Sequence, residues 1–259
     1  MSDSVEQPLL TIENLTKQFG GLLAVDSVCF TIQSQEIFGL IGPNGAGKTT
    51  MFNMLTGLIE PTQGKVIYEG RNIARLRPYQ IANYGIARTF QNLRLFGNLS
   101  VVENVEIARH RHNKTSLFAD ILNLSTARKA RQQDRETALE LLELVGLISL
   151  KNQQANNLAY GDRRRLEIAR ALALKPSLLL LDEPAAGMNP NEKAVLSQLI
   201  REIRDRFGLT IILIEHHIPL VMGLCERIAV LDFGKLIALG NPETVRQNPA
   251  VIEAYLGDE

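Results

Sequence analysis

The stretch GPNGAGKT, Gly42–Thr49, constrains this chain more than any other part of its sequence. It fits the pattern G-x-x-x-x-G-K-[S/T], in which the glycines let backbone N–H groups turn inward around a phosphate chain. Lys48 supplies a positive charge for the β- and γ-phosphates, and Thr49 supplies a hydroxyl for Mg²⁺. The preceding segment EIFGLI (36–41) is nearly all apolar, as in a strand buried on both faces. Because a helical stretch follows, the sequence predicts a phosphate site at a helix N-terminus.

Further apolar segments predict an α/β fold. Segments 177–182, 209–215 and 227–232 read as buried strands separated by helical stretches, which is typical of a parallel sheet covered on both faces. Segments 9–14 and 28–33 alternate like half-exposed strands. Residues 232–240 predict a closing hairpin.

The middle of the chain, from about 90 to 170, lacks strand signals. Residues 125–146 place Ala138, Leu141, Leu142 and Val145 at helical spacing, and Gly146 is a plausible C-cap. A charged helix with one apolar stripe is usually a surface helix, so we assign it no chemistry. A helical segment therefore interrupts the α/β core.

Composition excludes several classes of protein. Lys+Arg and Asp+Glu number 28 each, and this balance argues against a duplex-binding protein. Cys29 and Cys225 lie far apart and outside any C-x-x-C pair, so we expect reduced thiols rather than a zinc site or a disulfide. No apolar run reaches the roughly 18 to 20 residues of a membrane span, and the start does not read as a signal peptide. We expect a soluble cytosolic protein that meets a membrane only through a partner.

Acidic residues end another predicted buried strand, at Asp182 and Glu183. In such sheets, ligands bind at the carboxyl ends of strands. Asp182 is a candidate to hold Mg²⁺ through water, and Glu183 to orient or deprotonate a water in line with the γ-phosphate. Either His216 or His217 could reach the same edge, or be a plain surface residue. Gln91 by itself is a weaker candidate.

Taken together, these residues resemble the ATPase subunit of an ABC transporter, and the resemblance covers nearly the whole chain. The motifs appear in the family's order: Phe19 for the aromatic that stacks on adenine, Gly42–Thr50 for Walker A, Gln91 for the Q-loop, 158–162 (LAYGD) for the signature, 178–184 for Walker B, 185–190 for the D-loop and His216 for the switch histidine.

The resemblance implies a P-loop NTPase core with a mainly parallel sheet, an N-terminal antiparallel β subdomain and an inserted α-helical subdomain. We expect a single ABC ATPase domain, with residues 1–90 and 166–259 forming the core and about 91–165 the helical part. It implies ATP and Mg²⁺ as cofactors, with Glu183, His216, Gln91 and Lys48 as catalytic residues and Thr49, Gln91 and Asp182 at the metal. The residues expected to bind nucleotide are Phe19, Gly42, Pro43, Asn44, Gly45, Ala46, Gly47, Lys48, Thr49, Thr50, Ala159, Tyr160 and Gly161.

In this family two ATPase subunits face each other, and each signature closes over the nucleotide held by the other subunit. LAYGD would be the remote half of an ATP site, with a helix starting near Gly161 whose N–H groups face the partner's γ-phosphate. Arg163, Arg164 and Arg165 splay around that helix, since successive residues turn by about 100°. We expect them to be solvated or to form salt bridges between subunits, rather than to bind nucleic acid.

Two positions depart from the family pattern. Ala159 stands where a serine usually bonds the γ-phosphate, and Asn189 stands where the D-loop usually has aspartate. Losing one hydroxyl contact costs about 1 kcal/mol or more. An asymmetric pair, in which a non-identical partner supplies a fuller signature, would compensate for the loss.

The ATPase subunit does not touch the cargo, so only closeness of resemblance bears on it. Segments such as RTFQNLRLF and IEHHIPLVM look like the ATP-binding subunit of bacterial branched-chain amino acid importers. The alternatives are urea importers, lipopolysaccharide exporters and non-transport ABC ATPases of DNA repair, chromosome organisation or translation. The implied partners are a second ATPase subunit, identical or paralogous, membrane-spanning permease subunits and, indirectly, a periplasmic or extracellular substrate-binding protein. The implied location is the cytoplasmic face of the membrane.

Overall fold

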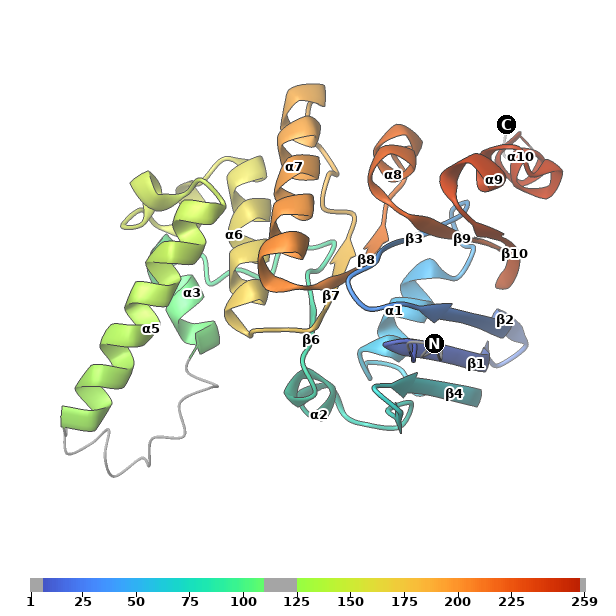
Figure 1. Ribbon diagram of the computed structural model, residues 1–259, viewed down its shortest axis with the longest axis horizontal. Helices are drawn as coiled ribbons and strands as arrows, with labels where there is room; N and C mark the ends of the chain where they lie inside the picture. Colours follow the sequence, from blue (N-terminus) through green and yellow to red (C-terminus); the bar gives the residue numbers. More distant parts are fainter. Residues whose placement is uncertain (1–6, 110–124, 257–259) are drawn as a thin grey trace, which may run out of the picture.

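The structure, a computed structural model, describes residues 7–109 and 125–256 (Figure 1). A four-stranded sheet has the order β2-β1-β4-β5 and a six-stranded sheet the order β10-β9-β3-β8-β7-β6. The strands are β1 (Leu10–Phe19), β2 (Leu22–Ile32), β3 (Ile37–Ile41), β4 (Gln63–Tyr68), β5 (Arg71–Asn72), β6 (Ile86–Arg88), β7 (Leu178–Asp182), β8 (Thr210–Ile214), β9 (Arg227–Asp232) and β10 (Lys235–Gly240).

Helices surround the sheets and form an arm at one end of the molecule (Figure 1). They are α1 (Lys48–Leu55), α2 (Pro78–Asn83), α3 (Val101–Arg109), α5 (Ser125–Leu144), α6 (Tyr160–Ala173), α7 (Pro190–Phe207), α8 (Ile218–Leu224), α9 (Pro242–Arg246) and α10 (Pro249–Leu256), with 3₁₀ turns at Ile148–Leu150 and Ala155–Asn157. Within the described ranges, no helix has the length and apolar character that a membrane crossing requires.

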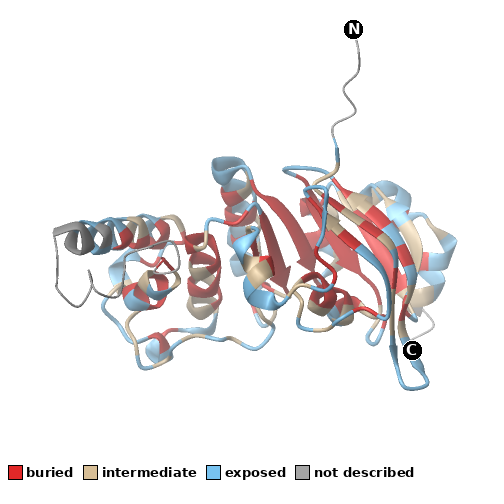
Figure 2. Ribbon diagram, turned by 90° about the horizontal axis from the view of Figure 1, so that it is seen from below, coloured by how far each residue is buried: buried red, intermediate tan, exposed pale blue. Residues whose placement is uncertain are grey.

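The six-stranded sheet confirms the predicted α/β class. Strands β9, β3, β8, β7 and β6 run parallel to their neighbours, and β10 closes the sheet as an antiparallel hairpin with β9. The central strands β3, β7 and β8 are buried at every position, which explains their unbroken apolar runs (Figure 2).

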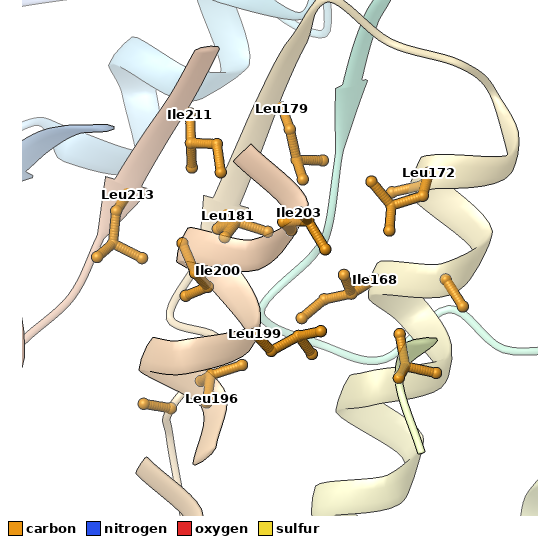
Figure 3. Packing of buried hydrophobic residues seen from close by; sticks show 14 of the residues in the cluster. Ile168, Leu172, Leu179, Leu181, Leu196, Leu199, Ile200, Ile203, Ile211 and Leu213 are labelled. Carbon is orange, nitrogen blue, oxygen red and sulfur yellow. The ribbon is translucent and has the colours of Figure 1, made fainter. Parts of the chain in front are cut away.

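Alternate residues of each central strand enter two different cores, because side chains of a strand point to opposite faces. Leu179 and Leu181 of β7 pack against α6 and α7, where they meet Ile168 and Ile200 (Figure 3). Leu178 and Leu180 face the other way, into the core shared with α1 and the four-stranded sheet. The central sheet is therefore held rigidly from both sides, and so are the carboxyl ends of its strands.

The four-stranded sheet is antiparallel, and all but one residue of each predicted segment, 9–14 and 28–33, lie in the longer strands β1 and β2. It faces α1 on the opposite side of the central sheet from α7 and α8 (Figure 1). Strand β1 ends at Phe19, which brings that aromatic ring toward the N-terminus of α1.

The arm is built from α3, α5 and α6, which pack against one another. The predicted stripe of α5 is confirmed, since Ala138, Leu141, Leu142 and Val145 are all buried. Gly146 ends the helical stretch with φ 71°. Helix α6 runs without a break past residues 165 and 166, the expected boundary between arm and core, and so belongs to both.

Candidate nucleotide site

The phosphate-binding loop has the predicted setting between a buried strand and a helix. Strand β3 ends at Ile41 and α1 starts at Lys48. Gly42 has φ 148°, and a Cβ there would lie 2.0 Å from the carbonyl oxygen of Leu231. Gly47 has φ 101°, and its Cβ would lie 2.5 Å from the carbonyl oxygen of Ala24. Glycine at these two positions therefore lets the loop lie tightly against β9 and β2.

Lys48 is buried and folded back over the loop. Its Nζ donates to the carbonyl oxygens of Gly42 and Pro43, each at 2.7 Å. Burial lowers the pKa of the Lys48 ammonium, although the charges of Glu183 and Asp182 oppose that shift. The ammonium thus has main-chain acceptors that a phosphate group could replace.

A pocket of about 380 Å³ opens over the loop. It is formed by the end of β1, the start of β2, the loop itself, and residues that follow β6, β7 and β8. Its lining residues are Phe19, Leu22, Ala24, Asn44, Gly45, Ala46, Gly47, Lys48, Thr49, Thr50, Gln91, Glu183 and His216. Phe19 is 43% exposed, so its ring is available for stacking, and the Nζ of Lys17 lies 5.0 Å from the ring centroid.

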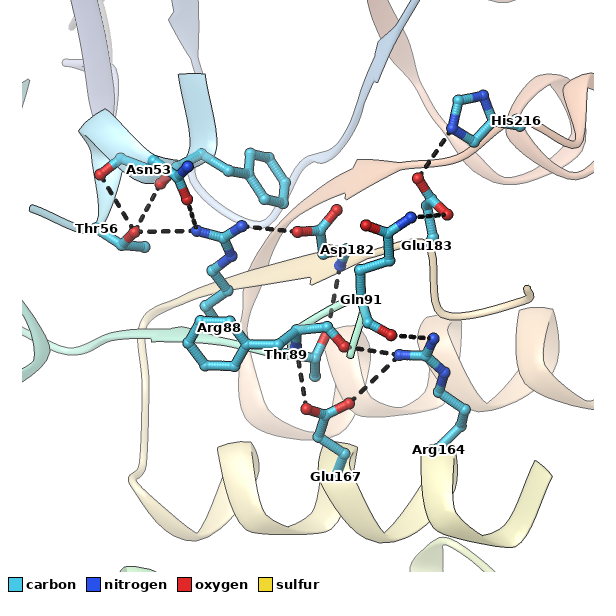
Figure 4. Close-up of polar contacts among 12 residues, drawn as sticks. Asn53, Thr56, Arg88, Thr89, Gln91, Arg164, Glu167, Asp182, Glu183 and His216 are labelled. Atoms are coloured by element: carbon cyan, nitrogen blue, oxygen red, sulfur yellow. Dashed lines mark hydrogen bonds and ion pairs between the residues drawn. The ribbon is translucent and has the colours of Figure 1, made fainter. Parts of the chain in front are cut away.

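Glu183 is held at the pocket by side chains from two other segments (Figure 4). Its Oε1 lies 2.9 Å from Nε2 of His216, and its Oε2 accepts a hydrogen bond from Nε2 of Gln91 at 3.0 Å. Glu183 follows β7 with φ 49°, in the left-handed region, and its N–H donates to the carbonyl oxygen of Ile214. The Glu183 carboxylate, which follows β7, is therefore held between Gln91, which follows β6, and His216, which follows β8.

The two neighbouring histidines have different roles in the structure. His216 reaches Glu183, whereas His217 caps the N-terminus of α8 by accepting from the N–H of Leu220 at 3.3 Å. The alternative that the sequence left open is thereby resolved in favour of His216 at the pocket.

Asp182 turns away from Glu183, as adjacent residues at a strand end should (Figure 4). It is buried, and its Oδ2 pairs with Nη2 of Arg88 at 2.7 Å. Arg88 also donates to the side-chain oxygens of Asn53 at 2.8 Å and Thr56 at 3.3 Å. Sequence reasoning missed Arg88, although an arginine in the otherwise apolar segment GIARTF was a signal for a buried ion pair.

The residues expected at a metal offer oxygen donors. Thr49 is exposed at the start of α1 and offers its hydroxyl. Gln91 donates a hydrogen bond to Glu183 through its amide nitrogen, so its amide oxygen is left for other partners. Asp182 has a second oxygen besides the one that Arg88 binds. Such neutral and anionic oxygens are what Mg²⁺ prefers. Among residues 7–109 and 125–256, no cluster of three His, Cys, Asp or Glu side chains could bind a metal ion alone.

The signature segment lies apart from this pocket. Ala159, Tyr160 and Gly161 are absent from its lining; Ala159 and Gly161 line a separate hollow of about 270 Å³ with Met188 and Glu192. The structure thus brings residues 44–50 of the Walker A loop together with Phe19, Gln91, Glu183 and His216, whereas Asp182 ends β7 and does not line the pocket. It does not bring the signature of the same chain to that site.

The two departures from the family pattern differ in their local consequences. Asn189 is the N-cap of α7: its Oδ1 accepts from the N–H of Glu192 at 3.0 Å, and Glu192 Oε2 accepts from the N–H of Asn189 at 2.8 Å. This capping box works with asparagine as well as with aspartate. Ala159 is the N-cap of α6 and makes no side-chain cap, so the first turn of that helix keeps its N–H groups for other acceptors.

The expectation that the arginines are solvated or bridge two subunits was wrong for Arg164, whereas Arg163 and Arg165 are half-exposed. Arg164 is only 2% exposed and binds main-chain carbonyls of 90 and 91. Arg163 donates to the carbonyl oxygen of Leu158 at 2.9 Å, and Arg165 pairs with Asp162. Each of the three thus has a partner within the chain, and for Arg163 and Arg164 the partners are carbonyl oxygens of loops beside α6. Helical spacing predicted that the arginines diverge but could not reveal these loops.

Family comparisons agree with this geometry. The family model described as ABC transporter matches residues 25–186. A second, described as branched-chain amino acid ATP-binding cassette transporter, matches residues 235–259.

Three curated relatives match almost end to end. The high-affinity branched-chain amino acid transport ATP-binding protein LivG of Escherichia coli (strain K12) is 49% identical, over 98% of this chain and 100% of LivG. BraF of Pseudomonas aeruginosa, with the same description, is 44% identical over 98% and 100% of the two chains. The lipopolysaccharide export system ATP-binding protein LptB of Haemophilus influenzae is 37% identical over 97% and 98%.

Solved structures share the fold. The ADP conformation of MJ1267, an ATP-binding cassette of an ABC transporter, superposes with a TM-score of 0.84 at 30% identity, over 97% of this chain and 99% of that one. A dimeric post-hydrolysis state of the cassette MJ0796 with ADP and phosphate has a TM-score of 0.77 at 26% identity, over 90% and 98%.

Proposed function

The chain belongs to the ABC transporter family of ATPases, and on that premise we propose that it powers a membrane importer of branched-chain amino acids. The observation that carries the ATPase part is the pocket in which the Walker A loop faces a glutamate held between Gln91 and His216. The amino-acid cargo is supported by the match of residues 235–259 and by 49% identity to LivG along the whole chain.

In this proposal ATP lies along the pocket with adenine on the ring of Phe19. The backbone of residues 42–47 cradles the phosphates, and the side chains of Lys48, Thr49 and Thr50 face them. Lys48 exchanges the carbonyls of Gly42 and Pro43 for the β- and γ-phosphates.

Mg²⁺ would be held by the hydroxyl of Thr49, the amide oxygen of Gln91 and, through water, Asp182. When bound, the ion neutralises charge that develops between the β- and γ-phosphates. The contact with Arg88, 2.7 Å between Nη2 and Oδ2, fixes the direction of the Asp182 side chain.

Hydrolysis requires a water aligned with the γ-phosphate. Glu183 takes the role of general base because its carboxylate ends at the pocket and is already oriented from both sides. His216 orients Glu183 and can donate to the γ-phosphate, and Gln91 orients Glu183 from the other side. Lys48 stabilises the charge on the transferred group.

The other half of each ATP site comes from a second ATPase subunit, identical or paralogous. The uncapped N-terminus of α6, at Ala159, Tyr160 and Gly161, would face the γ-phosphate of the partner's ATP. ATP drives association because it binds the closed pair better than the open one. We keep the division of the chain into a core (1–90 and 166–259) and a helical part (about 91–165) as a proposal, with α6 as the joint.

Permease subunits would bind the groove near Gln91, where a hollow of about 260 Å³ lies between α6 and the segment after β6. A periplasmic or extracellular binding protein would act only through that permease. The ATPase would then lie on the cytoplasmic face of the membrane, and no nucleic acid takes part.

The test is ATPase activity of the reconstituted transporter with candidate binding proteins. A leucine-loaded binding protein should stimulate hydrolysis several-fold over the empty one. Stimulation by a urea-loaded protein alone, or by lipopolysaccharide alone, would replace the amino-acid cargo by one of the alternatives. Retention on DNA or ribosomes without any permease would overturn the transport role.

A further inference from the structure

Arg164 joins the signature helix to the segment that carries Gln91. It lies in the first turns of α6, with its guanidinium inside the protein (Figure 4). Nη1 donates to the carbonyl oxygen of Phe90 at 2.7 Å, and Nη2 donates to that of Gln91 at 2.6 Å. The planar guanidinium thus spans two successive carbonyls, a geometry that lysine cannot reproduce.

Glu167, one turn further along α6, binds the same segment by accepting a hydrogen bond from its main chain. Its Oε1 accepts from the N–H of Phe90 at 3.0 Å, while its other oxygen lies 3.6 Å from Nη1 of Arg164. The main-chain N–H and carbonyl groups of Phe90 are therefore both bound by side chains from one face of α6. Because these groups are buried, the hydrogen bonds define one position of the backbone.

Gln91 connects this fixed backbone to the carboxylate of Glu183. Its carbonyl oxygen is bound by Arg164, and its side-chain amide donates to Glu183 at 3.0 Å. A shift of Arg164 would therefore change the direction of the Glu183 carboxylate without any change in the phosphate-binding loop.

Tyr160 extends this chain of contacts to the surface. Its hydroxyl oxygen accepts from Nε and Nη2 of Arg164 at 3.2 and 2.8 Å, and the ring lies close to Gly187. Tyr160 is 45% exposed at the start of α6, on the surface that in the proposed function closes over the partner's nucleotide. The family signature usually has glycine here, so this contact depends on a residue particular to the LAYGD sequence.

We propose that Arg164 is a positioning residue for hydrolysis, which together with Tyr160 links the signature surface to the orientation of Gln91 and Glu183 in the same subunit. This inference rests on the proposed ATPase function. Through this link, contact between the start of α6 and the ATP bound by the partner subunit would set the orientation of Gln91 and Glu183 in the subunit that carries α6.

Two conservative variants test this role in the assembled transporter. Tyr160→Phe removes one hydroxyl and keeps the ring, and we expect kcat to fall about three- to tenfold. Arg164→Lys keeps the charge but cannot bridge two carbonyls, and we expect a fall in kcat of about tenfold or more. KM for ATP should change by less than about twofold in Arg164→Lys, because the Arg164 side chain is buried and does not line the pocket.

The same variants in a Gln91→Ala background separate positioning from general stability. If Arg164 acts through the side chain of Gln91, Tyr160→Phe should cause no further loss in that background. An undiminished loss would overturn the proposal, and so would wild-type kcat in both single variants. The matched control is Arg201→Lys, an arginine on α7 that also donates to a carbonyl, that of Gly223, and it should keep wild-type kcat.

Glu183→Gln in the same preparations distinguishes this inference from the proposed function. If Glu183→Gln is inactive while the Tyr160 and Arg164 variants are fully active, only the positioning role fails. If Glu183→Gln hydrolyses ATP normally, the assignment of the catalytic site itself fails.

Discussion

At the scale of single residues, Glu183 has the most demanding position. Its backbone lies in the left-handed region, and its two oxygens are bound by Gln91 and His216. Such strain costs about 1 to 3 kcal/mol and persists where the surroundings fix it. The arrangement suits a carboxylate that must point at one water molecule rather than at bulk solvent.

Glu183→Gln should slow ATP hydrolysis by about 10²-fold or more, as loss of a general base does, and should leave ATP binding intact. The amide keeps the size of the side chain and one acceptor oxygen, so the pocket retains its shape. Single-turnover hydrolysis and equilibrium ATP binding measure the two effects. Glu202→Gln, on the exposed side of α7, is the matched control. Normal turnover in Glu183→Gln would refute its role as the base.

Ala159→Ser should stabilise the chain by about 1 kcal/mol, because serine at an N-cap can accept from the first turn of the helix. The backbone at Ala159, with φ −59° and ψ 157°, is already extended. Urea unfolding measures the gain, with Ala159→Gly as a control that restores no hydroxyl. ATPase activity should be equal or higher, and a large loss would mean that the alanine has a function of its own.

At the scale of secondary-structure elements, α7 begins in the D-loop, and its cap fixes where that loop ends. Asn189→Ala should cost about 1 kcal/mol of the free energy of unfolding, because it leaves the N–H of Glu192 without its acceptor. Asn189→Asp should preserve stability, since aspartate caps equally well. Thermal unfolding of the three proteins checks the order, and equal stability of wild type and Asn189→Ala would contradict the capping role.

The turn after β8 is tied to the turn after β7 by the buried carboxylate of Glu215. It accepts from the N–H groups of Ala185 at 2.6 Å and His216 at 3.2 Å. Burial nevertheless raises the pKa of Glu215 above its usual 4.5, and the charge of Glu183 adds to that rise.

A raised carboxyl pKa makes folding less favourable as pH rises. The folded state holds the Glu215 proton more tightly than the unfolded state, so its stabilising contribution is complete below pH 4.5 and is lost up to the folded-state pKa. The stability of wild type relative to Glu215→Gln should therefore decrease with pH in that window and stay constant above it. Urea unfolding across this range measures the difference, and the opposite slope would refute the burial effect.

At the scale of the whole molecule, the pocket with the Walker A loop and the start of α6 have separate linings. In the proposed function these are two halves of different ATP sites, and a second subunit completes each site. The nucleotide would then lie between the two subunits, and its binding would control their association.

ATP should therefore convert Glu183→Gln from monomer to dimer if the working pair is identical, as sedimentation or size-exclusion measurements would record. Slow hydrolysis preserves the nucleotide that joins the two chains. Lys48→Ala in the Glu183→Gln background should remain monomeric, because it lacks the charge that binds the β- and γ-phosphates. A dimer that forms equally without ATP would contradict nucleotide control.

The sequence by itself determined the class of fold and the place of the Gly-rich loop between a buried strand and a helix. Buried strands such as Ile37–Ile41 are apolar on both faces, and a Gly-rich loop before a helix has few other structural uses, so these local patterns were sufficient. The positions of the D-loop and signature could also be predicted, because their spacing follows a known family order.

Only the tertiary structure decided which side chains meet. Arg88 with Asp182, Arg164 with Gln91 and His216 with Glu183 are separated in sequence by 94, 73 and 33 residues. The first and third pairs form because parallel strands bring their carboxyl ends to one edge, and the second forms because α6 packs beside the segment that follows β6. Sequence periodicity describes one element at a time. It therefore predicted that Arg164 points away from Arg163 and Arg165. The carbonyls that Arg164 binds belong to residues 90 and 91, which are distant in sequence and are brought to α6 only by tertiary packing.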